Sequence, residues 1–113
     1  MRYRANRSNP QIGIAWTAPG FNDSGWASGH YGAGYELAPP GAEALIQTTV
    51  TAHSYSVYTR ALFTIADLSQ VQTLLLGVDY DDGYIAWING VEVARSSEMP
   101  SGCLLYTSDA ADE

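Results

Sequence analysis

Three aspartates around one glycine, in the stretch VDYDDGYIAW, are the residues most able to do chemistry in this sequence. Asp79, Asp81 and Asp82 could supply several of the oxygen ligands that a calcium ion requires. The stretch lacks the spacing of an EF-hand loop, because Asx residues are missing at the required alternate positions and no Glu closes it. Aspartates also serve turns, where they accept hydrogen bonds from nearby backbone amides. We therefore expect a turn here, with a structural calcium ion as the alternative.

Aromatic side chains supply a second kind of candidate site. Three tryptophans and eight tyrosines are more aromatic surface than the core of so small a domain needs. Sugars present apolar C–H faces that stack on such rings, while polar side chains bind the hydroxyls. The predicted ligand-binding residues are Tyr31, Tyr35, Tyr80, Asp82, Tyr84 and Trp87. Trp16 and Trp26 are expected to be buried, and the strand that carries Trp87 could turn either face to the core.

Catalytic arrangements are missing from the pattern. His30 and His53 lie far apart with no Asp–Ser arrangement near them, so a triad has no support. Acidic residues are available for glycoside hydrolysis, yet nothing singles out a pair of them. The single cysteine, Cys103, cannot form an internal disulfide. We therefore expect a domain that is not an enzyme. A small hydrolase is kept as the third hypothesis, after the two non-catalytic ones given below.

The charge of the chain limits its partners. The net charge is −7, lysine is absent, and the five cations are arginines of which only the N-terminal ones cluster. Nucleic acid and anionic membranes are therefore poor partners, and neutral or cationic ligands are better ones. No run approaches the roughly 20 apolar residues that cross a bilayer. The basic start, MRYRANRSNP, has no apolar stretch behind it, so we do not expect it to be a signal peptide.

Glycine and proline clusters predict one small β-rich domain. Alternating or β-branched segments predict strands over residues 45–50, 57–65, 71–79, 84–88 and 91–95. Asn89-Gly90 suits a type I′ turn between the last two, and DYDDG a longer turn before them. Arg60, mid-strand, is expected to pair with Glu92 or Asp79. The residues given structural roles are Trp26, Arg60, Gly83, Asn89, Gly90 and Glu92.

Three segments together resemble the galactose-binding-domain-like jelly rolls that serve as accessory modules of secreted bacterial proteins. They are WTAPGFNDSGWASGHYGAGYE, SVYTRALFTI and LGVDYDDGYIAWINGVEVARSSEMPSG. The first matches an F-D-D-S-x-W pattern, with Asn22 where an Asp is usual; the second matches Y-x-R-x-x-F. The third matches a Y-D-D-G hairpin, and a similar DDG turn holds calcium in PA14-type sugar-binding domains. The resemblance implies an antiparallel two-sheet sandwich and a non-catalytic role.

The resemblance covers roughly residues 2–102, and we interpret residues 1–102 as one galactose-binding-like module, a fragment of a longer one. Residues 103–113, CLLYTSDAADE, resemble instead a translated transposase adapter used in shotgun sequencing, so a non-native read-through tail is expected and the sandwich should be incomplete at its C-terminus. The implied function is carbohydrate binding within a larger extracellular or cell-surface protein. The alternative is a purely structural spacer that packs against a neighbouring domain of the same polypeptide and exposes an apolar patch.

Overall fold

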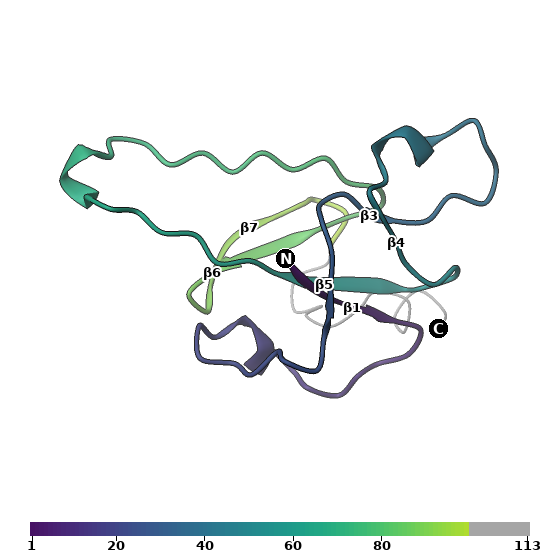
Figure 1. The fold of residues 1–113 in the computed structure, drawn as a ribbon, viewed down its shortest axis with the longest axis horizontal. Coiled ribbons are helices and arrows are strands. Elements are labelled where there is room, and N and C mark those ends of the chain that lie inside the picture. Colours follow the sequence, from purple (N-terminus) through teal and green to yellow (C-terminus); the bar gives the residue numbers. More distant parts are fainter. Residues whose placement is uncertain (100–113) are drawn as a thin grey trace.

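The computed structural model describes residues 1–99, and its regular structure consists of short strands and 3₁₀ turns (Figure 1). No α-helix occurs in this range, so the predicted β-rich class is confirmed. The strands are β1 (Arg2–Asn6), β2 (Ala27–Ser28), β3 (Ala33–Gly34), β4 (Thr48–Thr49), β5 (Ser56–Arg60), β6 (Ile85–Ile88) and β7 (Val91–Arg95). The 3₁₀ helices are η1 (Ala15–Thr17), η2 (Ala42–Leu45) and η3 (Leu68–Gln70).

The largest sheet joins β1 to β5 and β2, with strand order β2-β1-β5 and antiparallel pairing throughout. Arg2 lies opposite Arg60, and the register continues without a break to Asn6 opposite Ser56. Within β1 the exposed Arg2 and Arg4 alternate with the half-buried Tyr3 and Ala5, the period-two pattern of a half-buried strand. Asn6 at the end of β1 and Tyr58 in the middle of β5 are buried.

Strands β6 and β7 form the second sheet, a hairpin closed by Asn89-Gly90. Asn89 has φ 51° and Gly90 φ 82°, the positive values that the predicted type I′ turn requires. A register shift follows Ala86: this residue pairs with Ala94 and Trp87 with Glu92, which leaves Val93 as an extra residue in β7. The third sheet is a short parallel pairing of β3 with β4. Of the strand predicted over residues 45–50, only β4 forms, and Leu45 ends η2 instead.

An aromatic cluster forms the core. Trp16, on η1, is 6% exposed and stacks on Tyr58 of β5, with ring centroids 4.4 Å apart and planes 8° apart. Trp87 of β6 meets the same indole edge-on at 5.3 Å, and Trp26 lies tilted against it at 6.1 Å. Trp16 therefore joins the loop before β2, the large sheet and the hairpin. Its Nε1 is buried without a hydrogen-bond partner among the described residues, so packing alone holds this ring.

Residues 61–79, called the arm below, do not follow the prediction. In Figure 1 the chain leaves β5, runs out to η3 at one end of the molecule and returns, without forming a strand on either side of η3. The predicted strand over 57–65 therefore ends at Arg60, and the one over 71–79 is wrong. Leu74, Leu75 and Leu76 are all exposed. Strand propensity depends on neighbours to pack against, and no described strand lies beside this segment.

The coarse fold is thus a small β-rich domain with three separate small sheets. The read-through interpretation of residues 103–113 lies outside the described residues. Within residues 1–99 no helix is long and apolar enough to cross a bilayer.

Candidate ligand-binding site

The turn that leads into β6 brings two of the predicted tyrosines together. The rings of Tyr80 and Tyr84 lie 4.7 Å apart at 57°, with Tyr80 44% exposed and Tyr84 half-buried. Between them Asp82 has φ 74°, and the Gly83 amide donates to the Asp81 carbonyl at 3.1 Å. A positive φ at Asp is tolerated because its short polar side chain accepts this conformation more readily than most. The backbone therefore reverses here and leaves both aspartates exposed.

Glu98 adds a carboxylate beside the rings. Its negative charge raises the pKa of the Tyr80 hydroxyl, with burial, Tyr84 and a hydrogen bond between Tyr80 and Glu98 acting in the same direction. The pKa of Glu98 is lowered, first by its own backbone amide and then by the hydroxyls of Ser97, Ser96 and Tyr80. Glu98 therefore stays ionised and holds the Tyr80 hydroxyl as a donor. Rings, phenol and carboxylate form one polar aromatic surface.

Ser96 fixes the base of this surface. It is 7% exposed, its Oγ accepts from the Tyr84 amide at 3.0 Å, and its amide donates to the Tyr84 carbonyl at 2.9 Å. Gly83 packs closely over it, because a Cβ at this glycine would lie 2.9 Å from Met99 Sδ and 3.1 Å from Ser96 Oγ. A side chain at position 83 would therefore require Met99 to move. This contact is a physical reason for the structural role predicted for Gly83. The open end of the hairpin is therefore fixed by the hydrogen bonds between Ser96 and Tyr84 and by the packing of Gly83.

The remaining predicted ligand residues lie elsewhere. The Tyr31 hydroxyl donates to Thr59 Oγ1 at 3.2 Å on the large sheet, and Tyr35 lies 6.2 Å from the ring of His53. Trp87 packs edge-on against Trp16 in the core. The structure thus brings together Tyr80, Asp82 and Tyr84 but separates them from the other three.

The predicted calcium ligands do not converge with other donors. Among residues 1–99, no three or more His, Cys, Asp or Glu side chains are placed to hold a metal ion. The expected hydrogen bonds from turn amides to the Asp81 and Asp82 carboxylates are also not found among residues 1–99. The turn is made instead by the backbone at Asp82 and Gly83.

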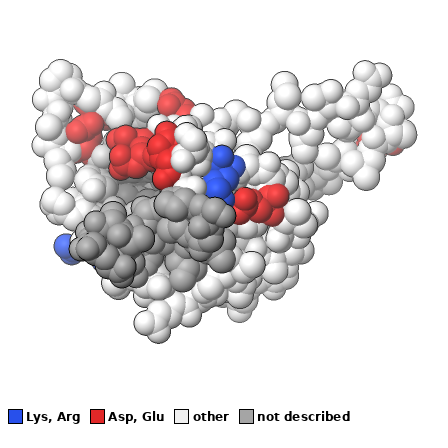
Figure 2. All heavy atoms as spheres, turned by 180° about the vertical axis from the view of Figure 1, so that it is seen from behind, with Lys and Arg blue, Asp and Glu red and all other residues white. Residues whose placement is uncertain are grey.

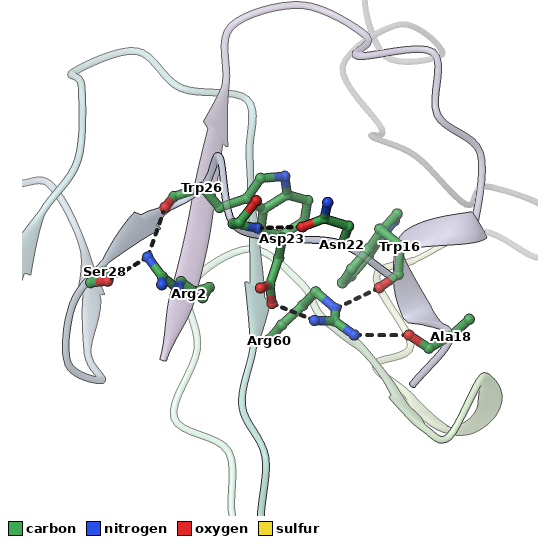
Figure 3. A network of polar contacts seen from close by, with 9 residues as sticks. Arg2, Trp16, Ala18, Asn22, Asp23, Trp26, Ser28 and Arg60 are labelled. Atoms are coloured by element: carbon green, nitrogen blue, oxygen red, sulfur yellow. Dashed lines mark hydrogen bonds and ion pairs between the residues drawn. The ribbon is translucent and has the colours of Figure 1, made fainter. Parts of the chain in front are cut away.

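Arg60 holds the loop before β2 against the sheet (Figure 3). Its Nε donates to the Trp16 carbonyl at 2.8 Å, its Nη2 donates to the Ala18 carbonyl at 2.8 Å, and its Nη1 pairs with Asp23. The guanidinium also lies 5.4 Å from the centroid of the Phe21 ring. The predicted ion pair is therefore confirmed, but its predicted partners are wrong.

Glu92, one of those predicted partners, pairs instead with Arg95 at 2.6 Å on its own strand. Asp23 lies in the FNDSGW segment, so two of the quoted sequence motifs meet at one ion pair. The prediction considered only residues on neighbouring strands, whereas Asp23 lies on a loop 37 residues away from Arg60 in the sequence.

Sequence reasoning also missed Glu98 and Ser96. Both residues lie in the ARSSEMP stretch that follows the hairpin. Because Ile85 pairs with Arg95, the residues after Arg95 lie beside Tyr84, and the predicted hairpin could have indicated this. Comparisons of the chain with protein-family models, curated proteins and solved structures found no match.

Proposed function

We propose that this chain is a non-catalytic carbohydrate-binding module of the galactose-binding-like, jelly-roll type, and that it binds a neutral sugar at the Tyr80–Tyr84 pair. The observation that carries the proposal is the tilted ring pair, with Tyr80 exposed and the Glu98 carboxylate beside it. A sugar ring would stack its C–H face on Tyr80, and its hydroxyls would donate to the carboxylate. The host would be a larger extracellular protein.

Binding of immobilised polysaccharides and of a glycan array tests the proposal. Tyr80→Ala removes the stacking surface and is expected to abolish binding, whereas Tyr80→Phe keeps the ring and should weaken it only severalfold. Tyr31→Ala is the matched control, because Tyr31 is a similarly exposed tyrosine whose hydroxyl contacts the large sheet. Folded protein that binds no glycan, or that loses binding equally in the Tyr31 variant, would contradict the site. Calcium should have no effect on binding.

A structural spacer is the second candidate, and the arm is the observation that favours it. Leu62, Phe63, Leu68, Leu74, Leu75 and Leu76 are all more than half exposed there. Figure 2 shows the arm projecting with almost no charged side chain on its visible face. Monomeric proteins rarely leave such a continuous apolar surface uncovered, and interfaces between domains commonly use one. Cross-linking of the intact host protein would place the arm against its neighbour, and glycan binding by the isolated chain would count against this role as the sole function.

A further inference from the structure

An open hollow of about 590 Å³ lies between the first residues of β1, the end of β2 and the end of β5. Its polar lining comes from Arg2, Asp23, Ser28, His30 and Arg60. None of these residues belongs to the Tyr80–Tyr84 site. Several hydrogen-bonding side chains from separate segments meet in it, which is the arrangement that small-ligand sites share.

Arg2 is held in one orientation by the protein. Its Nη1 donates to Ser28 Oγ at 2.8 Å and to the Trp26 carbonyl at 3.2 Å (Figure 3). Its Nε and Nη2 have no acceptor among residues 1–99. These two nitrogens form the edge of a guanidinium that presents two parallel N–H donors, and this edge matches the two oxygens of a carboxylate. The protein therefore anchors one end of the group and leaves the bidentate edge unused.

Arg60 differs from Arg2, because all three of its nitrogens are bound by the Trp16 carbonyl, the Ala18 carbonyl and Asp23. Its charge is offset by the Asp23 carboxylate. Two arginines against one aspartate give the charged side chains that line the hollow a net charge of +1, in a chain whose net charge is −7. The hollow is thus a local reversal of sign, and it attracts anions that the rest of the surface repels.

We propose that this hollow binds a carboxylate-bearing small molecule, with the Nε–Nη2 edge of Arg2 gripping the carboxylate. Leu62, 88% exposed, and Ala61 supply an apolar wall for the remainder of the ligand. A carboxylate fits better than phosphate because one planar donor edge satisfies both of its oxygens, while a tetrahedral anion would keep oxygens without a donor. The proposal is independent of the Tyr80–Tyr84 site.

Titration followed by NMR chemical shifts tests it with D-glucuronate, D-glucose and inorganic phosphate as probes. We expect glucuronate to shift the amides of β1, residues 27–30 and the end of β5, glucose at the same concentration to leave them unchanged, and phosphate to bind at least severalfold more weakly. Equal shifts with glucose would overturn the role of the carboxylate. Phosphate binding as tight as glucuronate binding would overturn the planar-edge argument.

Two substitutions on β1 distinguish specific binding of glucuronate by Arg2 from non-specific attraction of an anion to positive charge. Arg2→Gln should lower glucuronate affinity at least tenfold, whereas Arg4→Gln, which removes the same charge from an exposed position outside the hollow, should leave it within twofold. Arg2→Lys keeps the charge but loses the edge, and should weaken binding nearly as much as Arg2→Gln. Equal losses in the Arg2 and Arg4 variants would overturn the proposal. Tyr80→Ala should change nothing here, so failure of one site is distinguishable from failure of the other.

Discussion

Residues 71–79 and residues 84–95 have similar alternating apolar patterns, yet the second stretch becomes the β6–β7 hairpin and the first remains in the extended arm. Two local features separate them. The hairpin has a turn whose residues adopt the required positive φ, and it has Trp87, which packs on the core indole. The arm has neither a tight turn that folds it back on a strand nor an aromatic anchor. Alternation alone therefore marks a segment that can form a strand, and contacts decide whether it does.

The largest expected effect comes from removing the core indole of Trp16, on which the hairpin packs through Trp87. Trp16→Ala removes the indole that meets Trp87 and stacks on Tyr58. We expect a loss of about 3–5 kcal/mol of unfolding free energy, measured by urea denaturation followed by far-UV circular dichroism. A loss of that size can exceed the margin of a small domain, so disappearance of the cooperative transition is an equally consistent result.

The control for that loss lies in the arm. Leu75→Ala removes a similarly apolar side chain that is 87% exposed, and should change stability by less than about 0.5 kcal/mol. If both variants were destabilised alike, the arm would be packed in solution and the contrast between the regions would be false.

Amide hydrogen exchange sharpens the comparison without a mutation. Within the arm, backbone hydrogen bonds outside regular pairing are confined to those of η3, made by the Gln70 and Val71 amides. The paired amides of β6 and β7 should therefore exchange roughly a hundredfold more slowly than those of residues 72–79, because exchange requires the hydrogen bond to open. Peptide-resolved mass spectrometry measures this ratio. Equal protection would mean that residues 72–79 pair as a strand after all.

The turn can be tested with two glycines, one in each region. Gly90 has φ 82°, so Gly90→Ala forces a side chain into the left-handed region at a cost of about 1–2 kcal/mol. Gly77 lies in the arm with no atom near the position of a Cβ and no positive φ. Gly77→Ala should be neutral or should stabilise by up to about 1 kcal/mol through the unfolded chain. Thermal unfolding of both variants checks the difference in sign, and destabilisation by the Gly77 change would contradict it.

Features set by neighbouring residues were predictable from the sequence, and those set by distant contacts were not. The Asn89-Gly90 turn, the β-rich class and the burial of Trp16 follow from local chemistry or composition. The partner of Arg60 did not, because Asp23 lies on a loop whose position depends on Trp16 packing. In the candidate site, Tyr80, Asp82 and Tyr84 are neighbours along the chain and were found together. Glu98 joins them only through the hairpin register, and the free edge of Arg2 depends on where Ser28 lies.

The smallest effect distinguishes two carboxylates, one in each region. Arg95 lowers the pKa of Glu92 in the hairpin, chiefly through a side-chain hydrogen bond and also through its charge, while the Ser69 hydroxyl and amide lower the pKa of Asp67 in the arm. Both groups contribute stability that is present above their unfolded pKa values and is lost as the pH falls through the folded ones. NMR titration should find both pKa values below the ordinary range for their residue types.

Salt then separates the two causes. At about 1 M NaCl, where the screening length is near 3 Å, the pKa of Glu92 should rise toward its ordinary value because its partner is a cation. Asp67 should move less, since its partners are neutral hydrogen-bond donors. Arg95→Gln should raise the pKa of Glu92 in the same direction and leave Asp67 unchanged. Equal salt sensitivity of the two carboxylates would mean that neutral donors do not hold Asp67, and that η3 is not formed at the end of the arm in solution.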